Sequence, residues 1–143
     1  MKDTTAGTSQ PKNTKNFNHD QLYKALLDVR DLLERCVVPM ILLGETSRCA
    51  WDDKNLGGQE IVVGIKKMEY SDLVKRTLKS LRPSGVLEDT EFRYLVDDVP
   101  VRIKVIQRRY EFMQNLDRKY YLYDEYLFPN PFEKYFKARY IVQ

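Results

Sequence analysis

Three acidic side chains lie around an apolar segment in the first half of the chain, where they could bind a metal ion. Asp52 and Asp53 lie in a polar stretch, and Glu60 directly precedes the apolar residues 61–65. Two acids at positions i and i+2 of a strand point to the same side, and a third acid from a neighbouring strand completes a cage for Mg²⁺. Such a cage neutralises a polyphosphate and activates an attacking oxygen. If the polar stretch folds back toward the start of the strand, these acids converge, and Glu60, Asp53 and Asp52 are then candidate catalytic residues, with Glu60 and Asp53 as candidate metal ligands.

Hydrophobic periodicity predicts the elements that would position these side chains. An amphipathic helix is expected from Asn18 to about Arg35, because Asn is a favourable N-cap and apolar residues recur at three- and four-residue steps. A second helix is expected to begin after Ser71 and to end at Pro83. Buried strands are expected over residues 37–43 and 60–65, with a helical turn at 46–51 and a loop over 52–59 between them. A hairpin with arms at 92–96 and 101–106 follows. A last helix is expected to begin at Asn130-Pro131, and its aromatic stripe is expected to pack in the core.

The order of these elements predicts an α/β (α+β) fold, with a small mixed β-sheet and helices packed mainly on one face. Residues 1–16 are polar and almost without apolar side chains, so we expect a disordered tail followed by a single domain over residues 17–143. On the second arm of the hairpin, Arg102 and Lys104 alternate with apolar residues and therefore share one face. These two cations either face Glu60 and form an internal ion pair or lie on a solvent-facing side of the strand.

Charge and composition narrow the classes of partner. The net charge is +3, of which +2 belongs to the polar tail, so the domain is nearly neutral and nucleic acid is an unlikely partner. No apolar run approaches the ~20 residues that span a bilayer, so no membrane partner is expected. Two cysteines, Cys36 and Cys49, are too few for a disulfide scaffold or a zinc site and favour a reducing, cytoplasmic location.

The order of elements and several local motifs resemble the nucleotidyltransferase superfamily, and within it the LicD-like (choline-phosphotransferase-like) and abortive-infection-type branches. The motifs are the turn at residues 42–48, the run Trp51-Asp52-Asp53, the strand at 60–65, the arm at 99–105 and a closing segment at 128–135. The resemblance covers roughly residues 18–140. It implies that Gly44, Thr46, Ser47 and Arg48 bind a phosphate or another ligand at the turn, and that an active member would use Mg²⁺.

The chain departs from this family pattern at the expected metal site. The position two residues after Glu60 is Val62, which has no group that binds a metal. The place of the third acid falls on Arg102 or Lys104, which would repel Mg²⁺ and are candidate ligand-binding residues instead. Glu45 also stands beside the glycine, where the family usually has a small residue.

These departures lead us to expect a catalytically degenerate nucleotidyltransferase-like protein. Its partner would be a nucleotide-like or phosphorylated small molecule, or another protein. One alternative is an active, divergent transferase of nucleotidyl or phosphocholine-type groups that uses Glu60 with Asp52 or Asp53. Another is a structural or assembly protein that self-associates through the tyrosine-rich residues 107–128.

Overall fold

The computed structural model describes residues 16–108, 121–123, 125–127, 132 and 135–138. Its helices are α1 (His19–Arg35), α2 (Gly44–Arg48) and α3 (Asp72–Leu81), and there is a π-helical turn at Cys49–Asp53 and a 3₁₀ turn at Lys67–Glu69. Its strands are β2 (Ile41–Leu42), β3 (Ile61–Lys66), β4 (Val86–Leu87), β5 (Glu91–Val96), β6 (Val99–Arg108), β7 (Tyr121–Tyr123), β8 (Glu125–Leu127) and β9 (Phe136–Ala138).

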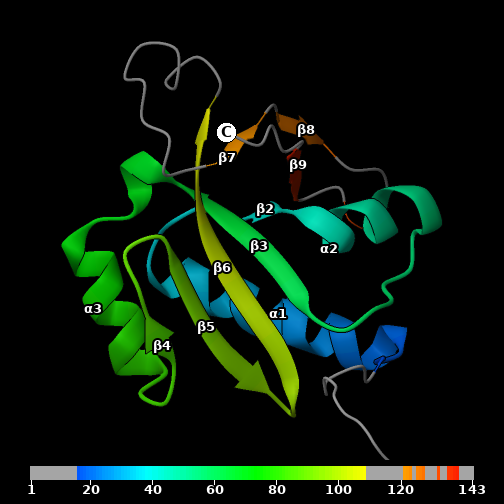
Figure 1. Ribbon diagram of the computed structural model, residues 1–143, viewed down its shortest axis with the longest axis horizontal. Coiled ribbons are helices and arrows are strands. Elements are labelled where there is room, and N and C mark those ends of the chain that lie inside the picture. The colour runs from blue at the N-terminus through cyan, green and yellow to red at the C-terminus, as the bar shows by residue number, and fades with distance from the viewer. Residues whose placement is uncertain (1–15, 109–120, 124, 128–131, 133–134, 139–143) are drawn as a thin grey trace, which may run out of the picture.

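The strands form one mixed sheet in the order β4-β5-β6-β3-β2-β9-β8, with β7 paired to β6. The pairs β3–β6, β2–β9 and β6–β7 are parallel, and the others are antiparallel. In Figure 1, α1 crosses behind the sheet, and none of the described helices lies in front of β5, β6 and β3. The predicted fold class, a mixed sheet with helices packed on it, is confirmed.

Helix α1 begins at the residue that the sequence indicates. The Asn18 side chain accepts a hydrogen bond from the Gln21 N–H at 2.9 Å, and the Gln21 side chain accepts one from the Asn18 N–H at 3.0 Å. This reciprocal capping box satisfies two amide groups that a helix start leaves without partners. The apolar stripe of α1 is buried and consists of Leu22, Ala25, Leu26, Val29, Leu32 and Leu33.

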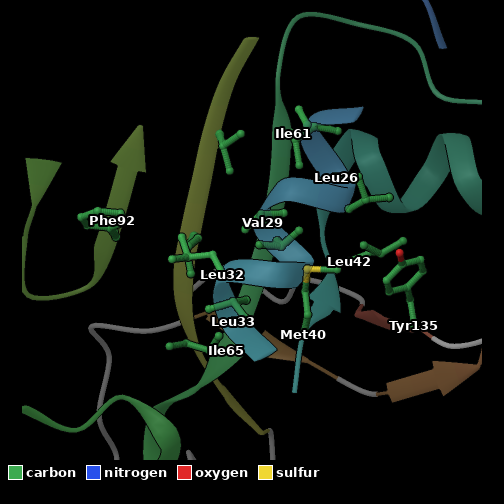
Figure 2. Packing of buried hydrophobic residues seen from close by; sticks show 14 of the residues in the cluster. Leu26, Val29, Leu32, Leu33, Met40, Leu42, Ile61, Ile65, Phe92 and Tyr135 are labelled. Carbon is green, nitrogen blue, oxygen red and sulfur yellow. The ribbon is translucent and has the colours of Figure 1, made fainter. Parts of the chain in front are cut away.

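The main core lies between α1 and the inner face of the sheet. Figure 2 shows Leu26, Val29 and Leu32 of α1 among apolar side chains of β3, including Ile61 and Ile65. Helix α3 contributes Val74 and Leu78 to the same cluster. Because strand side chains alternate, the residues between these inward-facing positions project from the opposite side of the sheet, here called the outer face.

Two contacts hold the loop that leads into β3. The His19 Nδ1 atom accepts a hydrogen bond from the Leu56 N–H at 2.8 Å. Phe17 pairs with Gly58 as an isolated antiparallel bridge, with its N–H donating to the Gly58 oxygen at 2.8 Å. The start of α1 therefore fixes where β3 begins, and with it the position of Glu60.

The hairpin of β5 and β6 closes through a two-residue turn. Asp97 and Asp98 have φ angles of 48° and 70°, and Val96 pairs directly with Val99. Positive φ at both central residues defines the type I′ geometry that matches the twist of hairpin strands. The loop is thus shorter than the four residues expected from the sequence.

Several sequence-based expectations for elements are wrong. The strand expected over residues 37–43 is reduced to Ile41–Leu42, because the residues after α1 form a helix-terminating turn. The last helix is also wrong where the structure describes it, since Phe136–Ala138 is strand β9 and pairs with β2. On α3, the apolar side chain of Leu73 does not join the core, because the residue is 64% exposed. Asp52 and Asp53 belong to a π-helical turn and not to a loop.

Other expectations are partly or wholly untested. Phe132 and Tyr135 are buried, as expected for the aromatic stripe. Residues 1–15 of the expected tail, much of the tyrosine-rich stretch and most of the closing segment lie outside the described residues. Among the described helices, none is both long enough and apolar enough to cross a membrane.

Candidate functional site

The pairing of β3 with β6 places the predicted metal positions side by side on the outer face. The two strands are parallel, and Val62 is the direct partner of Arg102. Partners in adjacent strands project to the same side of a sheet, and Glu60 shares that side because it lies two residues before Val62. The Arg102 Nη1 atom lies 3.4 Å from the Glu60 Oε2 atom. Of the two alternatives for Arg102, the structure therefore shows the internal ion pair.

Arg102 belongs to a longer chain of ion pairs along the outer face. Its guanidinium also contacts the Glu91 carboxylate, with Nη2–Oε1 and Nε–Oε2 distances of 3.2 and 3.3 Å. Glu91 is shared with Arg93, whose Nε atom lies 3.3 Å from Oε2, and Arg93 reaches Glu88 at 3.3 Å. We call the residues Glu60, Arg102, Glu91, Arg93 and Glu88 the ion-pair ladder.

The ladder holds Arg102 in its charged form. Burial by itself lowers the pKa of Arg102. The hydrogen bonds to Glu91 and the nearby charge of Glu60 raise it by more than burial lowers it, so the pKa of Arg102 lies above its ordinary value. The side chains of Arg102 and Glu60 are about one third exposed, whereas Glu91 is 16% exposed. Removing Arg102 would leave Glu60 without this ion pair and the partly buried Glu91 carboxylate with Arg93 as its remaining cation, which costs stability.

The glycine turn lies against β3 next to this site. Gly44 has a φ of 53°, a conformation that glycine adopts without steric cost, and it begins α2. The Leu43 N–H donates to the Val62 oxygen at 3.1 Å, and the Val62 N–H donates to Thr46 Oγ1 at 2.9 Å. The Thr46 hydroxyl, a predicted ligand-binding group, is thus buried and holds α2 on β3.

The remaining predicted residues of the turn form a second cluster. Arg48 makes a bidentate contact with Glu45, and its Nη1 atom lies 3.8 Å from the Asp53 Oδ2 atom. The hydrogen bond from Arg48 holds the pKa of Glu45 below its usual range. Ser47 is 3% exposed, and its hydroxyl has no hydrogen-bond partner among the described residues. The positive charge of Arg48 therefore neutralises the Glu45 carboxylate.

The structure does not bring the predicted acids together. Asp52 and Asp53 are exposed in the π-helical turn, where Asp53 lies 3.8 Å from Arg48, whereas Glu60 pairs with Arg102. Across residues 16–108 and the shorter described segments, no three His, Cys, Asp or Glu side chains converge as a metal site would require. Lys104 is half-buried on the outer face, opposite Gly64 of β3 and Glu91 of β5.

The donor set at the predicted site does not fit Mg²⁺. Mg²⁺ takes oxygen ligands in a near-octahedral arrangement and is repelled by a cation in direct contact with its ligand. Here Glu60 supplies one carboxylate, Val62 supplies no ligand, and the neighbouring position holds a cation that already binds Glu60. No catalytic step through a metal can be derived from these residues.

A shallow groove of about 480 Å³ lies beside the ladder on the outer face. Its lining includes Val86, Leu95 and Pro100 together with Arg93 and Arg102. Leu95 is 66% exposed and Val86 is 47% exposed. Exposed apolar side chains therefore lie next to the charged groups of the ladder on this face.

Glu91, like Arg93 and Glu88, is a site residue that the sequence alone did not indicate. The hairpin was expected to start at Phe92, which left Glu91 outside the strand. The two-residue turn at Asp97-Asp98 fixes the register, so that counting back from it pairs Glu91 with Lys104 and Arg93 with Arg102. A turn made of Asp97 and Asp98 alone places Glu91 in the strand, two residues before the direct partner of Arg102.

Comparisons of the chain with protein-family models, with curated protein sequences and with solved structures found no match.

Proposed function

We propose that this protein is a nucleotidyltransferase-like scaffold that binds a protein partner through the outer face of its sheet and does not transfer nucleotidyl groups. The observation that carries this proposal is the position of Arg102. It is the direct neighbour of Val62 and binds Glu60, where an active site of this type needs a third acid. The arrangement of the Gly44 turn, β3 and β6 supports the likeness to a nucleotidyltransferase scaffold. The side chains of Val62 and Arg102 argue against metal catalysis on it.

A protein partner fits the outer face better than a nucleotide does. Both arginines that line the groove are already bound to carboxylates, and Glu60, Glu91 and Glu88 would repel a polyphosphate placed there. The exposed surface beside them is apolar, and apolar side chains together with arginine are enriched in the cores of protein interfaces. The expected partner therefore presents an apolar segment to Leu95, Val86 and Pro100.

The first test separates binding from catalysis. Calorimetric titration of the protein with each nucleoside triphosphate, with and without Mg²⁺, should show no metal-dependent binding. Tight binding that requires Mg²⁺ would contradict the proposal and would restore the alternative of an active transferase that uses Glu60.

The second test locates the partner surface. Proteins that crosslink to the wild-type chain should be lost with Leu95→Asp, which puts a charge into the groove. Leu73→Asp is the matched control, because Leu73 of α3 is 64% exposed and Leu95 is 66% exposed. If both variants keep the same partners, the outer face is not the binding surface.

A further inference from the structure

The single histidine of the chain, His19, joins the start of α1 to residues 54–59, which we call the β3-entry loop. Its Nδ1 atom accepts the hydrogen bond from the Leu56 N–H at 2.8 Å. Figure 1 shows the start of α1 beside the chain that runs from the π-helical turn to β3. One imidazole nitrogen therefore links two segments that lie 37 positions apart in the sequence.

This hydrogen bond exists only while the Nδ1 atom carries no proton. In a neutral imidazole one ring nitrogen donates and the other accepts, whereas both nitrogens donate in the imidazolium ion. A protonated His19 would present an N–H to the Leu56 N–H, so that two donors would face each other. Histidine ordinarily changes its charge between about pH 5 and pH 8. Mild acidification therefore removes the acceptor of the Leu56 amide.

An aromatic ring and a backbone amide contact the imidazole. The Tyr23 ring stacks on it, with centroids 5.4 Å apart and an angle of 18° between the planes, and the Leu56 N–H meets its edge. The charged side chains nearby on α1 and before Leu56 are all exposed: Asp20, Lys24, Asp52, Asp53 and Lys54. Of these, Lys24 pairs with Asp97, and Asp53 lies near Arg48. The contact to Leu56 is thus the one that changes when His19 takes up a proton.

The β3-entry loop depends on this contact at its centre. Near its two ends, the Asn55 N–H donates to the Cys49 oxygen at 3.4 Å, and the Phe17 N–H donates to the Gly58 oxygen at 2.8 Å. Leu56 itself is 5% exposed and packs in the main core. Loss of the acceptor leaves a partly buried amide unpaired, which is costly unless the loop moves outward and water reaches the amide.

We propose that His19 is a pH-sensitive latch on the β3-entry loop. At neutral pH the unprotonated ring holds the Leu56 amide and closes the loop on α1. In mildly acidic solution, protonation releases this amide, and the loop opens locally while the sheet stays folded. Opening frees the residues directly before Glu60, so acid loosens the end of the ion-pair ladder that Glu60 forms. The latch operates whether or not the outer face binds a partner.

Amide hydrogen exchange followed by NMR on the full chain tests the latch. The protection factor of the Leu56 amide, which corrects for the intrinsic effect of pH on exchange, should fall about tenfold between about pH 7.5 and pH 5. The Val62 amide is the internal control, because it donates to the Thr46 hydroxyl, which does not titrate in this range. An unchanged Leu56 amide, or an equal change at Leu56 and Val62, would overturn the inference.

Two substitutions assign the effect to the imidazole. His19→Asn keeps an acceptor that cannot be protonated, since the asparagine oxygen is as many bonds from the backbone as Nδ1, and its Leu56 amide should stay protected at both pH values. His19→Ala removes the acceptor, so Leu56 should be about tenfold less protected at both pH values, with Val62 unchanged. A pH-dependent Leu56 amide in His19→Asn, or a fully protected one in His19→Ala, would contradict the latch.

Discussion

Val37, the residue that follows the C-cap of α1, adopts a backbone conformation in which glycine is usually found. Its φ is 59°, although valine is β-branched and such residues rarely take a left-handed conformation. Two hydrogen bonds impose this geometry: the Val38 N–H donates to the Leu33 oxygen at 3.1 Å, and the Val37 N–H donates to the Glu34 oxygen at 3.0 Å. This is the Schellman ending of a helix, which places its left-handed residue at this position. Val37 therefore carries backbone strain.

Val37→Gly should raise the free energy of unfolding. The left-handed conformation costs an L-residue roughly 1–2 kcal/mol, and the greater freedom of glycine in the unfolded chain returns part of this, so we expect a gain of about 0.5–1 kcal/mol. Val37 is 84% exposed, so little buried apolar surface is lost. Urea denaturation measures the change. Val37→Ala keeps the Cβ atom and should gain less, and a Val37→Gly protein less stable than wild type would contradict the argument.

At the scale of elements, the parallel pairing of β3 and β6 determines what the outer face can do. It sets Val62 beside Arg102 and leaves Glu60 within ion-pair distance of the same guanidinium. Gly64 helps to bring Leu43 close, because a Cβ atom there would lie 2.7 Å from the Leu43 Cδ1 atom. The outer face therefore carries an ion pair and an apolar contact at this point of the sheet.

The double variant Val62→Asp with Arg102→Asp should create a divalent metal site. Together with Glu60 it places three carboxylates on neighbouring positions, so the variant should be destabilised by their repulsion and then stabilised by Mn²⁺ or Mg²⁺. Binding at a concentration 100 times the Kd adds about 2.7 kcal/mol to the free energy of unfolding. Thermal denaturation with and without metal measures the effect.

The control for this variant carries asparagine at both positions, which removes the same side chains without adding charge. It should respond to metal no more than wild type does. If the double aspartate variant also shows no response, the three positions do not share a metal-sized space, and the proposed likeness to the nucleotidyltransferase scaffold loses its main support.

At the scale of the whole molecule, one polar network joins α1 to the end of α3 and to β5. Asp28 accepts hydrogen bonds from Arg82 at 3.0 and 3.1 Å and from the Tyr94 hydroxyl at 2.8 Å. Arg82 also lies over the Tyr94 ring, 5.5 Å from its centroid. Burial, followed by the hydrogen bond to Asp28, raises the pKa of Tyr94 well above its ordinary value. Unfolding releases all three elements and exposes this hydroxyl.

The free energy of unfolding should therefore fall at alkaline pH. Below about pH 10 the tyrosine is protonated in both states and its contribution is intact; above that, the unfolded state loses the proton while the folded state keeps it. Each such tyrosine steepens the fall by about 1.4 kcal/mol per pH unit. The free energy of unfolding can be measured by urea denaturation at several pH values between 9 and 11. It should fall less steeply with pH in Tyr94→Phe than in wild type, and an identical pH dependence would rule out this role for Tyr94.

Local interactions allowed the sequence to determine the long first helix and the fold class, whereas it left open whether Arg102 faces Glu60 or solvent. The capping box at Asn18 and Gln21 and the apolar stripe of α1 involve residues only a few positions apart, and strand alternation fixes side-chain parity. Parity along each strand therefore indicates which charges can meet once the two strands pair.

Pairing between distant segments decided the rest. The aromatic spacing of the closing segment fits a helix, yet Phe136–Ala138 is a strand because β2 offers it a parallel partner almost a hundred residues earlier in the chain. The shortening of the strand before Ile41 depends on the turn that ends α1, and the place of Glu91 in the ladder depends on hairpin register. Hydrogen bonds between strands depend on which segments meet in space, so only the tertiary structure could fix these features.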